Sequence, residues 1–189
     1  VESGSITATY NQPKAIQVGD IKYPKNIFEL WSSSELEAIG IYEVVFDNTN
    51  YKNPEYYINT NQSFTFADDT VTASYGTATA RPLDDWSEEI NGVTHNNKGL
   101  KTLHKEVIDI QAYGLLEPND WLVVRNQEAG TAIPSDWSTY RAGVRTAAAD
   151  MKTKIDAVSD VDALAALYVY NDANPPVRPL GEFPTPPSS

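Results

Sequence analysis

Apolar and polar residues alternate with a period of two along roughly the first 80 residues. The alternating segments are rich in aromatic and β-branched residues, and Pro, Asn and Asp separate them: SITATY, AIQVGDIKY, YEVVFD, EYYINT, SFTFAD and TVTASYGTATA. This pattern predicts a β-rich domain over residues 1–81, built as an antiparallel meander. The last segment, residues 70–80, carries small and hydroxyl side chains on both faces, which predicts an edge strand or one that pairs with another chain.

One stretch of this first part changes period. In WSSSELEAIGI, Ser34 and Glu37 have the spacing of a capping box, and Gly40 follows the apolar positions. We predict one or two helical turns there. Residues 82–97 have little periodicity and predict a linker.

From about residue 98 the apolar positions step by three and four, as on a helix. Those of the first predicted helix, which should end before Pro118, are Leu100, Leu103, Val107, Ile110 and Gly114. Those of the second, which should begin at Pro134, are Trp137, Tyr140, Val144, Ala147, Met151, Ile155 and Val158. We predict that these two rows face each other in an antiparallel hairpin over residues 98–170. The connection is long for a loop, so we expect it to hold a strand at WLVV or to fold over the hairpin.

Ser159 with Asp162 predicts the cap of a last short helix, VDALAALYV. Residues 171–189 are rich in proline and without period, which predicts an extended tail that is mobile when nothing holds it. The predicted fold class is therefore α+β: an N-terminal antiparallel β-rich domain, a C-terminal α-helical hairpin and an extended proline-rich tail.

Composition narrows the possible partners. The chain has 189 residues, 41% hydrophobic and 21% charged, as folded proteins do, and a formal net charge of −12. Such a charge disfavours binding to nucleic acid or to an anionic membrane. Cysteine is absent, so thiolate chemistry and disulfides are excluded. The apolar runs are too short for a membrane-spanning helix, and we expect no signal peptide at the start VESGSITATYNQP.

Candidate catalytic chemistry is weak. Two histidines, His95 and His104, fall in a loop and on the polar side of a predicted helix, and no Gly-x-Ser-x-Gly elbow or phosphate-binding loop occurs. Adjacent acids occur as Asp68-Asp69, Asp84-Asp85 and Glu88-Glu89, which in so acidic a chain favour solvated turns over a glycosidase pair. Residues 47–50 lack the spacing of a calcium loop. We expect no catalytic residue, no metal site and no cofactor.

Tyrosines cluster at Tyr51, Tyr56 and Tyr57 among asparagines. Exposed tyrosine combines apolar area with hydrogen bonding, so the cluster is a candidate surface for binding a protein or a carbohydrate. Packing within the sheet is the interpretation that aromatic residues in a meander favour. Pro175, Pro176 and Phe183 of the tail are further candidates for partner binding.

The stretch DWLVVRNQEAGTAIPSDWSTYRAGVR holds two Asp-Trp pairs and several arginines. On a helix, Trp137, Tyr140 and Val144 share one face that should pack on the first helix, while Arg141 and Arg145 lie one turn apart on an adjacent face. Asp120 and Asp136 are natural capping or ion-pair partners. The residues predict a local structural lock, and a partner-binding groove is the alternative.

The same stretch resembles a pattern in small proteins of tailed bacteriophages. Its residues here are Leu115, Leu116, Asn119, Asp120 and Trp121, then Ile133, Pro134, Trp137, Tyr140, Arg141, Val144 and Arg145. It is similar to tail-fibre assembly proteins and to a related group of tail- or virion-associated proteins, and VGDIKYPKNIFELWSSSELEAIGIYEVV is similar to openings in the second group. The resemblance implies a structural or assembly role, with no catalytic residues.

The centre of the chain decides between the two groups. Many assembly proteins have a highly charged central helix, whereas this chain has a Thr- and Tyr-rich β segment there. The hypothesis is therefore a phage virion structural protein, tail- or fibre-associated, located in the virion and bound to other virion proteins and to copies of itself. The alternatives are a tail-fibre chaperone absent from the mature virion, a capsid decoration protein and, last, an enzyme using Asp85 or Glu88.

Overall fold

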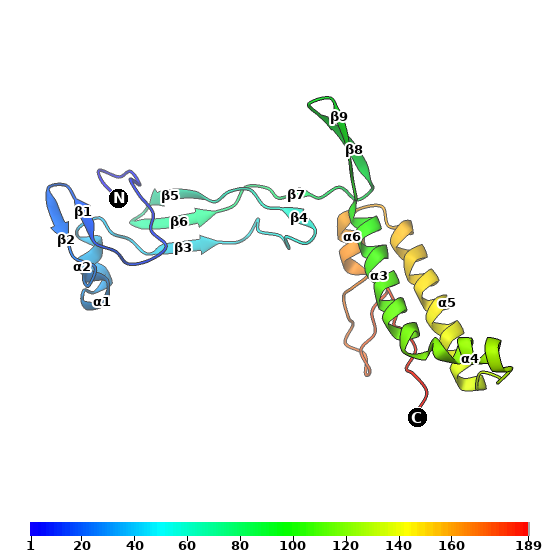
Figure 1. The fold of residues 1–189 in the computed structure, drawn as a ribbon. Helices are drawn as coiled ribbons and strands as arrows, with labels where there is room; N and C mark the ends of the chain where they lie inside the picture. The colour runs from blue at the N-terminus through cyan, green and yellow to red at the C-terminus, as the bar shows by residue number, and fades with distance from the viewer. Residues whose placement is uncertain (189) are drawn as a thin grey trace. The chain divides into compact units, whose positions relative to one another are not determined.

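A computed structural model describes residues 1–188, and residue 189, the last of the predicted tail, lies outside them. The chain divides into two units, Val1–Thr79 and Ala80–Ser189 (Figure 1). Short sheets and helices occur together, so the predicted α+β class is confirmed.

The first unit begins with an antiparallel hairpin, β1 (Ile16–Val18) and β2 (Ile21–Tyr23). Two short helices follow, α1 (Ile27–Leu30) and α2 (Ser33–Glu37). The helical turns lie where the period changed, but the capping box is formed by Ser32 and Glu35, two residues before the predicted pair. Ser32 is the residue with extended backbone there, so its hydroxyl meets the Glu35 amide.

The main sheet of this unit corrects the predicted meander. It contains β3 (Val44–Asp47), β6 (Thr70–Ser74) and β5 (Ser63–Ala67) in that order, with β6 in the centre and parallel to β3. The expected edge strand is thus the central one, because its alternate residues Val71 and Ala73 are small enough to be buried completely. Asp68 and Asp69 form the tight turn between β5 and β6 with positive φ, as solvated turn acids.

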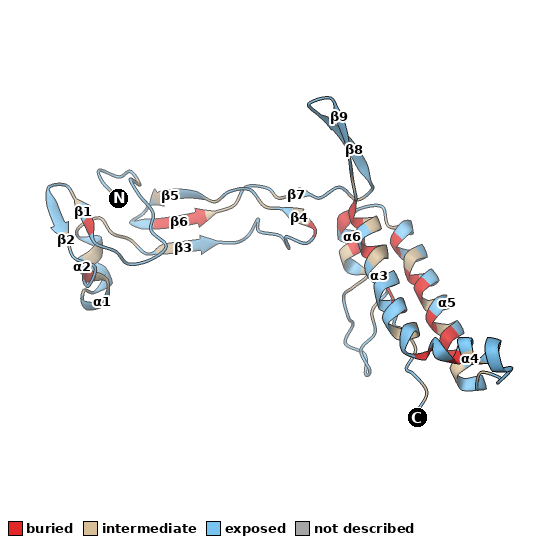
Figure 2. Ribbon diagram, in the orientation of Figure 1, coloured by how far each residue is buried: buried red, intermediate tan, exposed pale blue. Residues whose placement is uncertain are grey.

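β4 (Tyr57–Ile58) pairs with β7 (Thr79–Ala80) at the end of the unit. Few side chains of this unit are buried, as Figure 2 shows by the small number of red segments. Many large apolar residues are exposed instead: Tyr10, Ile21, Leu30, Val45, Phe46, Tyr51, Ile58 and Phe64.

Residues 82–97, predicted to be a linker, are structured. They contain an antiparallel hairpin, β8 (Trp86–Ile90) and β9 (Val93–Asn97), with Asn91 and Gly92 at positive φ in the turn. Asn-Gly favours the twisted two-residue turn that joins such strands. That local signal was present in the sequence, and the low periodicity of the surrounding residues obscured it.

The helices of the second unit are α3 (Leu100–Leu116), α4 (Trp121–Ala129), α5 (Ser135–Ala157) and α6 (Val161–Ala166), with a 3-10 turn η1 (Glu117–Asn119) after α3. The strand predicted at WLVV is wrong, because these residues open α4, which ends at Gly130 with φ +65°. The cap predicted for the last helix is also wrong. Asp160 is the residue that caps α6, by accepting the Ala163 amide hydrogen at 2.8 Å.

α3 and α5 pack side by side with opposite chain directions. Ion pairs join Lys105 to Asp156 at 2.6 Å and Asp109 to Lys152 at 2.7 Å. The buried residues of α5 are Tyr140, Arg141, Val144, Ala148, Met151 and Ile155, and those of α3 are Leu100, His104, Ile108 and Ala112. His104, expected on the polar side, is therefore in the core, where its Nδ1 lies 2.7 Å from the Tyr168 hydroxyl.

The row predicted to face α5 is mostly wrong. Leu103, Val107 and Ile110 are exposed, although Leu100 of the same row is buried. The inner row has a spacing of four throughout, so it winds slowly around α3 along the contact with α5. α3 thus has two apolar faces, and only one of them is covered among the described residues.

Candidate protein-binding site

Arg141 lies at the centre of the residues that carry the phage resemblance. Its buried guanidinium donates to the carbonyl oxygen of Leu116 at 3.1 Å, to the side-chain oxygen of Asn119, and to the Asp120 carboxylate at 2.6 Å. Asn119, also buried, donates back to the Leu115 carbonyl at 3.0 Å. One side chain of α5 therefore binds Leu116 at the end of α3, Asn119 at the end of η1 and Asp120 at the N-cap of α4, a local lock of the predicted kind.

The other motif residues divide between packing and exposure. Tyr140 is buried and meets the half-buried Trp137 edge to face, with ring centroids 5.8 Å apart. Arg145 is exposed and reaches only the Arg141 carbonyl, at 3.3 Å. Trp121 is exposed beneath the Arg125 guanidinium, 4.7 Å from the ring centre. Pro134 is exposed at the N-cap of α5, and Asp136 accepts the Trp137 amide within its own helix.

The three candidate tyrosines of the first unit do not form one exposed cluster. Tyr56 is buried, which agrees with the packing interpretation. Tyr57 is half-buried with the Lys52 ammonium 4.2 Å from its ring centre. Tyr51 is exposed and lies against the Tyr75 ring at 5.0 Å. Of the three, Tyr51 offers the most surface to a partner.

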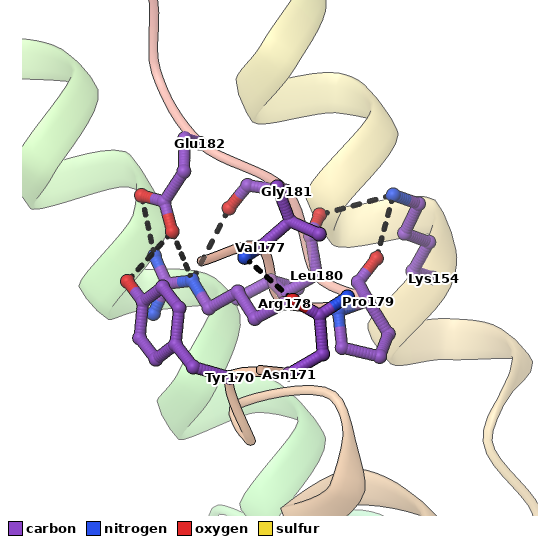
Figure 3. Close-up of polar contacts among 9 residues, drawn as sticks. All are labelled: Lys154, Tyr170, Asn171, Val177, Arg178, Pro179, Leu180, Gly181 and Glu182. Atoms are coloured by element: carbon purple, nitrogen blue, oxygen red, sulfur yellow. Dashed lines mark hydrogen bonds and ion pairs between the residues drawn. The ribbon is translucent and has the colours of Figure 1, made fainter. Parts of the chain in front are cut away.

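The C-terminal segment (residues 167–188) folds back onto the helices of the second unit (Figure 3). Leu180 is buried, and its amide donates to the Leu167 carbonyl at 2.9 Å. Lys154 of α5 donates to the carbonyl oxygens of Pro179 and Leu180 at 2.8 and 3.1 Å. A buried leucine and a lysine thus attach a stretch that was expected to be mobile.

Arg178 forms a second attachment beside Leu180. Its guanidinium pairs with the Glu182 carboxylate at 2.8 Å and lies over the rings of Tyr168 and Tyr170. The Tyr170 hydroxyl donates to the same carboxylate at 2.7 Å (Figure 3). This hydrogen bond to Glu182 raises the pKa of Tyr170 above its ordinary value of 10.0, since the neutral phenol is the form that donates.

The candidate prolines are placed differently from one another. Pro175 and Pro176 are exposed in a loop whose base is closed by Asn171, which bonds Val177 through both backbone and side chain. Phe183 is half-buried, and beyond it Pro184 contacts α5 so closely that a Cβ on Gly143 would lie 3.3 Å from its ring. Pro184 therefore contacts α5 of its own chain, whereas Pro175 and Pro176 are exposed at the loop tip, where a partner could reach them.

The acids weighed as catalytic have structural roles at the start of α3. Asp84 pairs with Lys101 at 3.0 Å, and Asp85 accepts the Gly99 amide hydrogen at 2.8 Å. That hydrogen bond, followed by one from the Thr102 side chain, lowers the pKa of Asp85 below its ordinary 3.8. Glu88 lies on the exposed hairpin opposite His95.

We predict that Asp85 stabilises the fold only above acidic pH. A lowered folded-state pKa means that the contribution is present above pH 3.8 and is lost as the pH falls through the lowered value. Asp85→Asn keeps an acceptor for the Gly99 amide but removes the charge. The wild type should therefore resist urea better than the variant at pH 7, and this difference should vanish in strong acid. An equal difference at both pH values would contradict the assignment.

The amount of exposed surface is large for the mass of the chain. The accessible area is 12,811 Å², whereas two separate compact units of these sizes would expose about 10,800 Å². The excess of about 2,000 Å² on one chain is comparable to the area that substantial protein interfaces bury.

Part of this surface is the β8–β9 hairpin. Its register places Trp86, Ile90 and Val93 on one face, where all three are exposed, and the same face also carries Glu88, His95 and Asn97. The opposite face is polar, with Ser87, Glu89, Thr94 and Asn96. An isolated two-stranded hairpin is marginally stable in water, so a hairpin that exposes three large apolar side chains is typical of an element that binds another surface.

Sequence reasoning missed the attachment of the C-terminal segment. A signal was present. The aliphatic Leu180 lies within the proline-rich stretch, and Arg178 and Glu182 have the i, i+4 spacing of an ion pair. It also took the exposed row of α3 for the buried row. The local sequence does not show which of two apolar rows on a helix packs within the chain.

A scan against protein-family models and searches of curated proteins and of solved structures found no match to this chain. Within residues 1–188, no three His, Asp or Glu side chains are grouped so that they could hold a metal ion. No helix in that range is both long and apolar enough to cross a membrane.

Proposed function

We propose that the chain is a structural protein of a tailed-phage virion, tail- or fibre-associated, which acts by binding neighbouring proteins in the particle. The observation that carries the binding role is the exposed surface, about 2,000 Å² more than compact units of this mass need. Exposed apolar residues occur in both units, so binding would cover more than one site.

The viral part of the proposal rests on the sequence resemblance. Several of the motif residues contact one another, with Arg141 bound to Asn119 and Asp120, and Trp137 against Tyr140. A family of structural proteins is expected to share a motif whose residues fix the local fold. This supports a common local fold and assigns no catalytic task.

In the proposed arrangement the N-terminal β-rich domain docks on a neighbour and the C-terminal helical hairpin is the stable body. The hairpin β8–β9 offers Trp86, Ile90 and Val93 as apolar anchors. Exposed strand edges, such as that of β3, can add backbone hydrogen bonds to an adjacent chain. The proline-rich tail presents Pro175 and Pro176 at a loop tip.

Quantitative mass spectrometry of purified particles tests this proposal, using the virus whose genome encodes the chain. We expect the chain in mature virions at the low copy number of a tail or fibre component. Presence only in lysates would favour the assembly chaperone. Hundreds of copies for each particle would favour capsid decoration. Either result would overturn the tail-associated assignment.

A further inference from the structure

The outer face of α3 has the spacing of a coiled-coil seam. Leu103, Val107, Ile110 and Gly114 follow one another at intervals of four, three and four residues, and Tyr113 lies beside them. The exposed fractions are 44% for Leu103, 48% for Val107, 69% for Ile110 and 62% for Tyr113. The row runs for about 17 Å along the helix, and we call these five residues the outer α3 face.

We propose that the outer α3 face binds the same face of a second copy of this chain. The inference deepens the proposed binding function, on which it rests, by naming one surface and its occupant. Seams of 4-3-4 spacing pack against seams of the same spacing, each apolar side chain entering a gap between four residues of the facing helix. A copy of α3 supplies such a seam, and a symmetric pair of copies would use one patch twice.

The outer α3 face itself carries no charged side chain, although the chain has a net charge of −12. Within α3, Lys101 and Lys105 balance Glu106 and Asp109. Each of the four already has an ion-pair partner in the same unit, on Asp84, Asp156, Lys98 and Lys152 respectively. Two copies can therefore approach through the outer α3 face without burying an unpaired charge.

Gly114 fits the same occupant. A Cβ at this position would meet no atom within 4 Å, so the packing of the chain itself does not require glycine there. A glycine in a helix costs conformational entropy. At a seam position it would let a second helix approach closely.

The apolar area of the face sets the strength of the contact. The exposed side chains present on the order of 400 Å², the size of patches that often mark interaction sites on monomers. Two such faces make a small interface of the transient class. We therefore expect reversible self-association of the isolated full-length chain, strengthened in a particle where other contacts hold the copies together.

Sedimentation velocity of the full chain over a range of concentrations tests the proposal. The wild type should sediment faster as its concentration rises. Val107→Glu should raise the dissociation constant about tenfold or more, because it places a charge in the seam. Ala149→Glu, an exposed position on α5 with the same added charge, should behave as the wild type. A monomeric wild type, or equal effects of the two variants, would overturn the proposal.

Cross-linking identifies the occupant, because the chain has no cysteine of its own. Ile110→Cys should give a disulfide- or bis-maleimide-linked dimer of the full chain, and Ala149→Cys should remain monomeric. A cross-link from Ile110→Cys to a different protein in purified particles would leave the proposed function standing and overturn this inference. A dimer in solution from a chain that is absent from virions would leave this inference standing and overturn the proposed function.

Discussion

Replacing Arg141 with methionine is expected to lower the free energy of unfolding by about 3 kcal/mol. The guanidinium is buried and supplies the hydrogen bonds that hold Asn119 and Asp120 in the turn between α3 and α4. Without it, the Asn119 side-chain oxygen is left in a buried place without its donor. The Asp120 carboxylate is half exposed, so water can solvate its charge. The loss therefore comes mainly from Asn119 and from the Leu116 carbonyl.

Arg145→Met is the matched control for this experiment. Arg145 lies one turn further along α5, is exposed, and makes a single long hydrogen bond to the Arg141 carbonyl. Its replacement should change the stability by about 0.5 kcal/mol or less. Urea unfolding followed by circular dichroism compares the two variants. Equal urea midpoints for the two variants would show that Arg141 has no special role in the fold.

Leu180→Ala is expected to cost about 3 kcal/mol, as truncation of a fully buried leucine does. The effect should be largest on the C-terminal segment, since Leu180 is its main buried anchor. We expect rapid proteolytic cleavage between α6 and the C-terminus in this variant, at sites that are protected in the wild type. Cleavage is read by mass spectrometry of the fragments.

Val177→Ala, in the exposed loop of the same segment, is the control. It removes apolar carbons close in sequence to Leu180 but from a solvated position, so both stability and protection should stay close to the wild type. If Leu180→Ala were cleaved no faster than Val177→Ala, the segment would not be attached as described.

α3 illustrates what could be predicted from the sequence and where prediction failed. Its position and its end before Pro118 followed from periodicity and proline chemistry. Its inner face did not, because the row that packs on α5 includes the polar His104 while the uncovered row is entirely apolar or glycine. Apolar spacing identifies helix faces that are suited to packing. It does not show whether the packing partner lies within the chain or in another molecule.

The prediction of a strand at WLVV failed for another reason. Four consecutive apolar residues fit a strand or a helix equally, and periodicity cannot separate the two over such a length. These residues form helix α4 because Arg141 binds Asp120 immediately before it and Gly130 ends it. The parallel pairing of β3 with β6 likewise has no local signal, since it joins segments 27 residues apart in register, as Val44 opposite Val71.

The candidate site was predictable only in part. The motif pointed to Asp120, Tyr140 and Arg141 before their contacts were known, because their residue types and helical spacing suit a packed, ion-paired lock. Leu180 and Arg178 were hidden in a proline-rich stretch, whose composition indicates an extended chain but not the surface on which it lies.

Electron cryo-microscopy of the particle is the most direct test that this chain serves as a virion binding subunit. We expect density for the chain at the tail or a fibre, with the apolar residues of β8–β9 and of the outer α3 face covered by neighbouring subunits. A particle that lacks the chain, or that holds it with both of these surfaces facing solvent, would contradict the account.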